Sequence, residues 1–429
     1  MKLFERLFKH ITLAFLLCFF APSTASSPNN EPTLQADSIE ISLLTCGPRQ
    51  QVYSMYGHTA IRFQDKQSGR DIAINYGVFS FDKPFFVLRF VFGLTDYEMG
   101  IAPFDIFEWE YDPTGCGVIQ QVLNLTAQEK MAIAQAVDRN MEPQNRVYRY
   151  NFFYDNCTTR ARDIIANNLN GRIVYDSSTP QHLNTSTPQH HNTPAQYPTF
   201  RNLIHNYNET HRWARFGNDL LLGVKADYNT TFEQQQFLPE RLCADFERAH
   251  IISADGTKRN LVSSSFWLFE PTTKQQSTQQ TNMSILDVFS PLVTFSILSI
   301  LTLIIAIVEY RRKRIIWVFD TIIMLTTGTC GLLLFAMIFS QHPTVSLNLQ
   351  ILLLNPINIF MLYSVTKAAH KNRIHWWTKA WSALILLFLA GSFLQSYAEG
   401  ITIVALSLLL RNISNIYTFK NTGSKQSEA

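Results

Sequence analysis

The pattern of hydrophobic and polar positions divides the chain into two parts. Between residues 38 and 268, short apolar runs are interrupted by polar and charged residues, which is typical of a soluble domain. Beyond a polar linker at 269–284, five apolar stretches follow, each near the roughly 20 residues that a helix needs to cross a bilayer. The pattern therefore predicts a soluble domain followed by five transmembrane helices within 286–418. The stretches are 286–308, 315–339, 347–366, 376–394 and 400–418.

The first 25 residues have the pattern of a secretory signal. Basic residues such as Lys2 and Lys9 precede the apolar run from Ile11 to Ala21, and the small residues Ser23 and Ala25 follow it. Such a segment is cleaved rather than retained as a membrane helix. We therefore expect a signal peptide over residues 1–25.

Basic loops predict the orientation in the membrane. Arg311 to Arg314 separate the first two apolar stretches, and Lys367, Lys371 and Arg373 separate the third and fourth. The intervening loops contain no Lys or Arg. By the positive-inside rule the basic loops face the cytoplasm, so we expect a periplasmic soluble domain, a multi-pass inner-membrane protein and a cytoplasmic C-terminus. The net charge of +3 comes largely from these loops and does not indicate a nucleic-acid partner.

Local patterns predict an α+β fold for the soluble domain. Alternating residues predict strands at 39–44, 60–63, 72–76, 117–125 and 146–153. A Thr126–Glu129 capping box predicts a helix to about residue 140, and residues 199–250 are expected to be largely helical. A phenylalanine-rich helix is expected at 82–93, either as core or in contact with lipid. Residues 177–196 contain the pentapeptide Ser-Thr-Pro-Gln-His twice, which indicates a low-complexity insert.

Two short segments carry candidate chemistry. His58 ends the segment Tyr-Ser-Met-Tyr-Gly-His and opens a predicted strand. Asn156 is a candidate N-cap, which makes Cys157 the first residue of a helix to about Leu169. The positive end of a helix dipole favours a thiolate, and a thiolate is the nucleophilic form of cysteine. We therefore expect Cys157 as nucleophile and His58 as its base, with His58 earlier in the chain than Cys157.

Asn75 is the candidate third member of this site. If the hairpin turn centres between Lys66 and Gln67, paired positions sum to 133, so that His58 lies opposite Asn75 on one face of the sheet. Directly opposed residues have Cβ atoms about 4.5–5.5 Å apart. Asn75 would then hold the imidazole in the required tautomer.

Several other polar residues leave alternatives open. Tyr53, Arg62 and Arg160 could bind a phosphate headgroup or make structural contacts. Asn355 and Asn358 are costly in lipid, so we expect them to face the interior of the helix bundle. The chain contains no CxxC pattern and no cysteine spacing typical of a zinc site. Cys46, Cys116 and Cys243 could form a disulfide in an oxidising compartment, but the sequence does not select a pair.

The segments around these residues resemble the Lnb family of Bacteroidetes. The resemblance rests on residues 43–46, 53–62, 75–79, 152–160 and 217–223, and it covers nearly the whole mature chain. Members of that family are regarded as lipoprotein N-acyltransferases. The order of histidine and cysteine also resembles that of circularly permuted papain-like enzymes such as lecithin:retinol acyltransferase. The insert at 177–196 and Cys116 are not part of the resemblance.

The resemblance implies a function. The chain would move an acyl chain from a phospholipid, through a thioester on Cys157, to the α-amine of a diacylglyceryl-cysteine lipoprotein. Phospholipid, lipoprotein and membrane would be its partners, and the reaction would need no cofactor and no metal. Two alternatives stay open: a membrane-anchored papain-like cysteine peptidase or amidase, and a non-catalytic envelope assembly factor.

Overall fold

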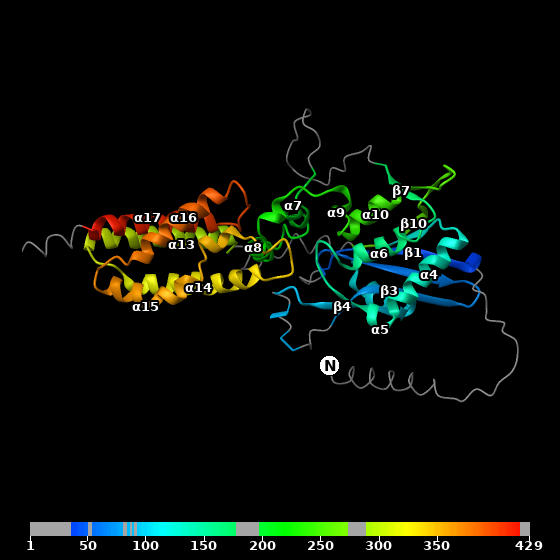
Figure 1. Cartoon of the computed structure of the whole chain (residues 1–429), viewed down its shortest axis with the longest axis horizontal. Helices are drawn as coiled ribbons and strands as arrows, with labels where there is room; N and C mark the ends of the chain where they lie inside the picture. The colour runs from blue at the N-terminus through cyan, green and yellow to red at the C-terminus, as the bar shows by residue number, and fades with distance from the viewer. Residues whose placement is uncertain are drawn as a thin grey trace, which may run out of the picture. The chain divides into compact units, whose positions relative to one another are not determined.

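The computed structural model describes residues 36–49, 54–79, 84–85, 88–89, 92–176, 197–272 and 289–420. The expected signal segment, the insert at 177–196, Tyr53 and half of the expected helix at 82–93 lie outside these residues. Figure 1 shows an N-terminal domain with a sheet and helices, and a C-terminal helical region. This arrangement agrees with the predicted α+β domain and the helices that follow it.

The N-terminal domain is built on a seven-stranded antiparallel sheet with the strand order β10-β5-β1-β2-β3-β4-β6. β6 is shorter than the strand expected at 146–153, because the chain turns back through a bridge between Asn151 and Asp155. β4 and β10 had no counterpart among the predicted strands. The strands are β1 (Ile39–Cys46), β2 (His58–Asp65), β3 (Arg70–Val78), β4 (Asp96–Pro103), β5 (Val118–Leu123), β6 (Val147–Arg149) and β10 (Val262–Phe269).

The expected register of the β2–β3 hairpin is wrong by two residues. Asn75 pairs with Ala60 and Arg70 pairs with Asp65, so paired positions sum to 135 rather than 133. The turn is displaced because Asp65 accepts hydrogen bonds from Gln67 N at 3.0 Å and from Ser68 Oγ at 2.5 Å. Gly69, at φ +73°, completes the turn in a conformation that favours glycine. A shift of two preserves the side-chain face, so His58 and Asn75 still share one side of the sheet.

Helices cover both faces of the sheet. On one face, Leu43, Ile61 and Ile74 pack beneath α4 (Ala127–Met141), α6 (Cys157–Ala166) and α10 (Pro239–Glu247). On the other face, Leu44, Ala60 and Ala73 pack with residues of α3 (Phe104–Tyr111). Full burial of one large aliphatic side chain contributes about 1.5–3 kcal/mol, so these two layers hold the sheet and its helices together.

Side-chain caps determine where α4 and α6 begin. Thr126 and Glu129 form the expected capping box of α4. Asn156 caps α6, because its Oδ1 accepts from the N–H groups of Thr158 and Thr159, both at 2.9 Å. Cys157 is therefore the first residue of the helix, as predicted, although α6 ends at Ala166 rather than near Leu169.

The remaining elements of the domain are short. A second, three-stranded sheet has the order β7-β8-β9. The region expected to be helical between 199 and 250 contains four helices and a 3₁₀ turn before β8. The elements are η1 (Ala36–Ser38), η2 (Asp112–Thr114), α5 (Pro143–Arg146), β7 (Arg172–Tyr175), α7 (Phe200–His205), α8 (Arg212–Leu221), η3 (Val224–Asp227), α9 (Phe232–Gln235), β8 (Ala249–Ile252) and β9 (Lys258–Asn260).

Over residues 289–420, the part of the C-terminal region that the structure describes, four helical spans are long and apolar enough to cross a membrane, and one apolar helix is shorter. The spans are α13 (Pro291–Arg312), α14 (Trp317–Ile338), η4 (Leu349–Leu352) with α15 (Ile357–His370), and α17 (Ile401–Lys420); the shorter helix is α16 (Trp376–Gly391). Asn355 and Asn358 are both buried, as predicted. Asn358 donates to Thr327 Oγ1 and accepts from Trp377 Nε1, both at 2.8 Å.

A buried ion network joins three membrane helices. Arg411 of α17 contacts Glu309 of α13 through two hydrogen bonds of 2.9 and 2.6 Å. It also contacts Asp320 of α14 at 2.6 Å. The side chains of Arg411 and Glu309 are only 3% and 0% exposed. The arginine in the last apolar stretch is therefore accommodated by two carboxylates inside the bundle.

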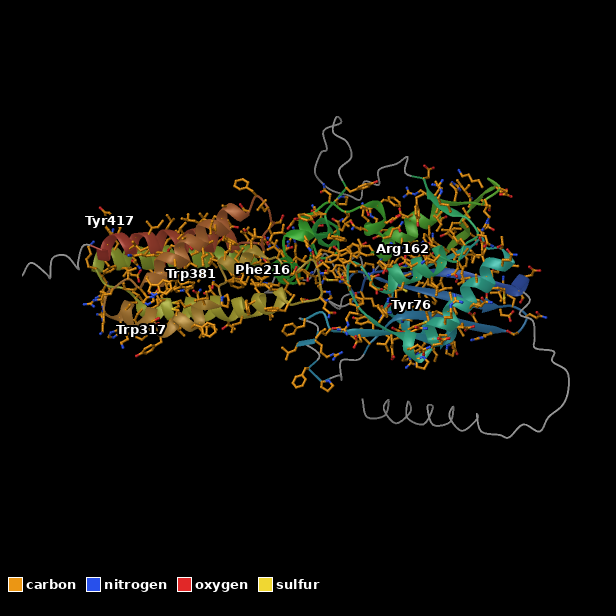
Figure 2. All side chains as sticks on the ribbon, viewed as in Figure 1. Tyr76, Arg162, Phe216, Trp317, Trp381 and Tyr417 are labelled. Carbon is orange, nitrogen blue, oxygen red and sulfur yellow. The ribbon has the colours of Figure 1, made fainter. Side chains whose placement is uncertain are left out.

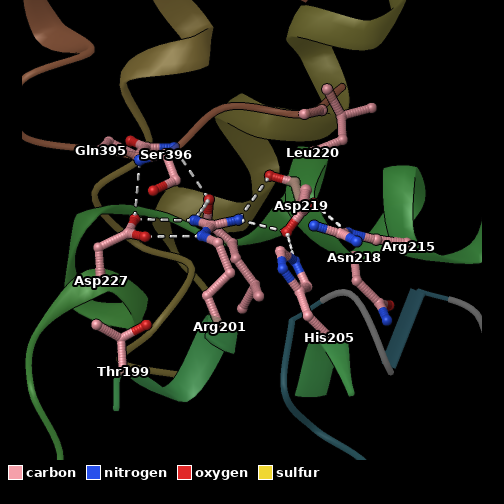
Figure 3. A network of polar contacts seen from close by, with 12 residues as sticks. Thr199, Arg201, His205, Arg215, Asn218, Asp219, Leu220, Asp227, Gln395 and Ser396 are labelled. Carbon is pink, nitrogen blue, oxygen red and sulfur yellow. Dashed lines mark hydrogen bonds and ion pairs between the residues drawn. The ribbon is translucent and has the colours of Figure 1, made fainter. Parts of the chain in front are cut away.

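A polar joint, formed by α7, α8 and η3 with residues 348–350 at the start of η4 and with the loop 395–398, connects the two regions. Figure 3 shows its part around Arg201, Asp219 and Gln395. Gln350 Nε2 donates to the main-chain oxygens of Asp219 and Leu220, at 2.9 and 3.1 Å. Asn348 Nδ2 donates to Leu220 O at 2.8 Å, and Gln395 Nε2 donates to Leu222 O at 3.0 Å.

Arg201 organises the N-terminal side of this joint. Its guanidinium binds Asp219 Oδ1 and Asp227 Oδ1, both at 2.8 Å, and is almost fully buried. The apolar side of α8, including Phe216 and Leu220, packs on the core of the membrane helices. Figure 2 labels Phe216 at this junction and Trp381 within the helical region.

Candidate active site

The structure brings His58, Asn75 and Cys157 together. His58 is the first residue of β2, Asn75 lies on the neighbouring strand β3, and Cys157 opens α6. All three line one pocket of about 180 Å³. The pocket forms where the ends of two strands meet a helix N-terminus, so residues separated by about a hundred positions face the same space.

The contact between His58 and Asn75 defines the imidazole tautomer. His58 Nε2 lies 2.9 Å from Asn75 Oδ1. The same oxygen accepts the backbone N–H of Gly77 at 2.6 Å. Because a backbone N–H only donates, the Asn75 atom at this position is oxygen, and the Nε2 of His58 must carry a proton to donate to it. This leaves Nδ1 as the nitrogen that can exchange a proton with Cys157.

Gly77 provides the space for the imidazole. A Cβ atom at this position would lie 2.7 Å from His58 Cε1 and 3.1 Å from Asn75 Oδ1. A side chain at residue 77 would therefore displace the histidine from Asn75. The absence of a side chain at position 77 leaves room for the His58 ring beside Asn75.

The pKa of Cys157 is set by opposing effects. Burial raises the pKa of the thiol, but the charge of His58 and its hydrogen bond lower it, and so does the backbone N–H of Thr59. The pKa of Cys157 falls from 9.0 to about 7 as a result. For His58, burial lowers the pKa, but the neighbouring Cys157 and the hydrogen bond with Asn75 raise it above its usual value. Both directions favour a thiolate beside an imidazolium.

Further contacts hold the pair in place. The ring of Tyr111 stacks on His58 with centroids 6.4 Å apart and an interplanar angle of 13°. Thr59 Oγ1 and Thr158 Oγ1 are 3.0 Å apart and buried, which ties the start of β2 to the start of α6. Cys157 and His58 are thus positioned by adjacent residues of the same two elements.

One wall of the pocket is aromatic and apolar. Tyr56, Phe152, Phe237 and Leu238 line it. These residues also belong to a hydrophobic cluster that includes Met337, near the end of α14, and Val345. The wall is therefore continuous with apolar packing against the membrane helices.

The arginines considered from the sequence have structural partners. Arg62 binds Asp71 through two hydrogen bonds of 2.9 and 2.6 Å. Arg160 binds Asp155 at 2.7 and 2.8 Å. These contacts favour the structural alternative over headgroup binding. Cys46, Cys116 and Cys243 are free thiols.

The pocket residues that sequence reasoning missed include Arg49, Glu110 and Tyr111. Glu110 and Tyr111 lie on α3, whose buried residues Phe104, Phe107 and Tyr111 have helical spacing that the sequence does show. Arg49 follows the end of β1 and carries no pattern that would single it out. Among the described residues, no group of three or more His, Cys, Asp or Glu side chains could hold a metal ion.

Two family models match the chain. Residues 27–203 match the model described as the Lnb N-terminal periplasmic domain. Residues 280–422 match the model described as the Lnb transmembrane domain. The searches of curated proteins and of solved structures found no match.

Proposed function

Because the chain belongs to the Lnb family and carries its periplasmic and transmembrane domains in order, we propose that it is a lipoprotein N-acyltransferase. It is a membrane protein with a periplasmic N-terminal domain. The observation that carries the proposal is the His58–Asn75 contact beside Cys157 at the start of α6. This arrangement supports covalent catalysis by a thiol with a histidine base.

The aromatic wall of the pocket supports a lipid substrate. Tyr56, Phe152 and Phe237 offer an apolar surface beside the thiol, and they pack in one cluster with Met337 and Val345. An acyl chain that enters from the bilayer can lie along such a surface. A peptidase that acts on a polar polymer has no need of this continuity with the membrane helices.

In the first half-reaction, the Cys157 thiolate attacks an ester carbonyl of a phospholipid. The side chain of Asn156 accepts hydrogen bonds from the N–H groups of Thr158 and Thr159. The N–H of Cys157, also in the first turn of α6, does not bind this cap and can donate to the developing oxyanion. When the intermediate collapses, the glycerol oxygen leaves with the proton from His58 Nδ1. Lysophospholipid is released, and a thioester remains on Cys157.

In the second half-reaction, the α-amine of a diacylglyceryl-cysteine lipoprotein attacks the thioester. Nδ1 of His58, now neutral, accepts the proton from the amine, and the thiolate of Cys157 leaves. The product is an N-acylated lipoprotein, and the enzyme returns to its starting state. The ester of the donor supplies the energy, so the steps require no nucleotide.

The proposal extends to topology and fold. We propose a secretory signal over residues 1–25, a catalytic domain over 38–268, a linker over 269–284 and five membrane crossings within 286–418. Five crossings that begin in the periplasm end in the cytoplasm, so the C-terminus is cytoplasmic and the protein lies in the inner membrane. The strand that carries His58 precedes the helix that carries Cys157, which supports a permuted papain-like arrangement. A membrane anchor raises the effective concentration of both lipid substrates near the pocket.

The test is the lipidation state of lipoproteins in cells. Cells whose only copy is Cys157→Ala or His58→Ala should contain lipoproteins with diacylated N-termini, as detected by mass spectrometry. Cys330→Ala, which removes a free thiol on α14, is the matched control and should give triacylated products. Triacylated lipoproteins in the Cys157→Ala cells would refute the mechanism.

An assay with purified protein separates the alternatives. Incubation with phospholipid should give an acyl adduct on Cys157 that hydroxylamine releases and a diacylated lipopeptide discharges. Discharge to water alone would indicate a lipase. Cleavage of a peptide or muropeptide without an acyl adduct would indicate a peptidase or amidase. Full function of the Cys157→Ala protein would favour the assembly factor.

A further inference from the structure

Arg49 lies in the pocket, and its positively charged side chain makes few polar contacts with the described residues. It lines the same pocket as His58 and Cys157. Its guanidinium lies over the ring of Tyr111, 4.0 Å from the ring centroid, and Tyr111 in turn stacks on His58. A chain of three stacked groups thus connects the cation to the catalytic pair.

The hydrogen-bonding capacity of Arg49 is poorly satisfied. Nη2 is buried and has no hydrogen-bond partner among the described residues. The nearest carboxylate oxygen is Glu110 Oε1, 3.9 Å from Nη1, and the Glu110 side chain is 54% exposed. Arg62 and Arg160, by contrast, each make two hydrogen bonds shorter than 3.0 Å to a carboxylate. The Arg49 side chain is 19% exposed, and a partly buried guanidinium without such partners is costly, which favours a role in binding an anion.

The chemistry of the pocket narrows the class of anion. A guanidinium presents a planar set of donors that fits a phosphate or a carboxylate. In the proposed reaction, which this inference presupposes, the acyl donor carries a phosphodiester on the glycerol unit whose ester lies at Cys157. The diacylglyceryl-cysteine acceptor carries no phosphate. Arg49, which lines the same pocket as Cys157, can therefore bind the phosphate of the acyl donor, whereas the acceptor offers it no phosphate.

We propose that Arg49 binds the phosphodiester of the phospholipid acyl donor and thereby sets the donor specificity of the pocket. The phosphate oxygens accept hydrogen bonds from the guanidinium while the ester carbonyl lies at Cys157. The phosphate stays with the lysophospholipid after acyl transfer, so Arg49 also contacts the leaving product. Neutral diacylglycerols, which carry the same esters without the phosphate, are poor donors.

The experiment compares two donors with identical acyl chains. The purified full-length protein is incubated in detergent micelles with dipalmitoyl phosphatidylethanolamine or with dipalmitoylglycerol. Mass spectrometry follows the rate at which a hydroxylamine-sensitive palmitoyl adduct forms on Cys157. The wild type should react faster with the phospholipid. In Arg49→Gln the ratio of the two rates should fall about 10- to 100-fold, as expected for the loss of a charge-assisted contact.

Two further variants sharpen the comparison. Arg49→Lys keeps the charge without the planar set of donors, so its rate ratio should lie between those of wild type and Arg49→Gln. Arg172→Gln changes an exposed arginine on β7 in the same way and should keep the wild-type ratio. Alkylation of Cys157 by iodoacetamide should proceed in Arg49→Gln as in wild type, which shows that the nucleophile is intact.

The outcomes separate this inference from the proposed function. If Arg49→Gln slows adduct formation with both donors equally, or with neither, Arg49 does not bind the phosphate. The inference is then overturned, while the proposed acyltransferase activity is unaffected. If the wild type forms no adduct with either donor, the proposed function fails and the inference fails with it. A fall in the rate ratio confined to the Arg49 variants supports the inference.

Discussion

Nε2 of His58 lies 2.9 Å from Oδ1 of Asn75, although the two residues are not directly opposed in the sheet. Asn75 pairs with Ala60, so the contact runs diagonally between β2 and β3. A diagonal pair requires room beside the ring, and Gly77 provides it. The imidazole is therefore held by a backbone feature as well as by a side chain, and both can be tested.

The ionisation of Cys157 gives the first prediction. Its alkylation rate with iodoacetamide should rise with pH through a midpoint of about 7, because the thiolate is the reactive form and His58 stabilises it. In His58→Ala the charge and the hydrogen bond of the imidazole no longer lower the pKa of Cys157, so the midpoint of alkylation should rise. Burial raises the pKa of Cys243 to about 11, so that thiol contributes little near neutral pH. Equal midpoints in the two proteins would show that His58 does not stabilise the thiolate.

Gly77→Ala tests the space for the imidazole. The new Cβ would lie 2.7 Å from His58 Cε1, so the ring must move away from Asn75. A displacement of about 1 Å in a catalytic group costs roughly 100-fold in rate, and we expect a loss of that order in acyl-adduct formation. Gly217→Ala, where a Cβ meets nothing within 4 Å, is the matched control and should retain wild-type rates. A fully active Gly77→Ala protein would contradict the described geometry.

Asn75 should act by positioning His58. Asn75→Ala removes the acceptor for His58 Nε2, and we expect a rate loss of about 10- to 100-fold with a raised midpoint for Cys157 alkylation. Asn75→Asp keeps an oxygen acceptor and should retain more activity than the alanine variant. A merely structural role for Asn75 would lower the melting temperature of Asn75→Ala without moving its alkylation midpoint.

Arg411→Met should destabilise the membrane helices. The change leaves the buried carboxylate of Glu309 and the partly buried carboxylate of Asp320 without their cation. Breaking a buried ion pair in this way costs about 3–5 kcal/mol, which thermal unfolding in detergent would detect as a lower melting temperature. The triple variant Arg411→Met, Glu309→Gln, Asp320→Asn removes the unpaired charges and should recover part of the loss. No recovery would show that packing, rather than charge, determines the effect.

Gln350→Ala should loosen the polar joint. It removes one donor from each of the main-chain oxygens of Asp219 and Leu220, which keep their bonds from Arg201 and Asn348, at a cost of about 0.5–1.5 kcal/mol for each lost bond. Hydrogen exchange should then increase in α8. Gln128→Ala, at an exposed position on α4, should leave exchange in α8 unchanged. Unchanged hydrogen exchange of α8 in Gln350→Ala would show that the apolar contacts of the joint, rather than these hydrogen bonds, hold the two regions together.

Local patterns predicted the elements that carry the candidate site, but not their register. The Asn156 cap placed Cys157 at a helix start correctly, because a cap depends on neighbouring residues alone. The hairpin register was wrong by two, because it depends on how the Asp65 side chain folds the turn. A register shift of two residues keeps each side chain on the same face of the sheet, so the predicted proximity of His58 and Asn75 was still correct.

Arg49 illustrates what local patterns do not contain. Its position in the pocket depends on α3, which is distant in sequence and brings Glu110 and Tyr111 beside it. No spacing within residues 46–49 encodes that contact. Arg62 was a candidate for the same chemistry, yet Asp71 on the facing strand neutralises it. Tertiary partners, rather than residue type, decide which arginine is available to a ligand.

The polar joint also bears on how the two domains can change over evolutionary time. Asn348, Gln350 and Gln395 supply amide side chains, whereas Asp219, Leu220 and Leu222 accept through main-chain oxygens. Every residue type carries such an oxygen, so substitutions on the periplasmic side leave these bonds in place. Periplasmic domains with divergent sequences can therefore pair with the same membrane helices, provided that the backbone of α8 keeps its path.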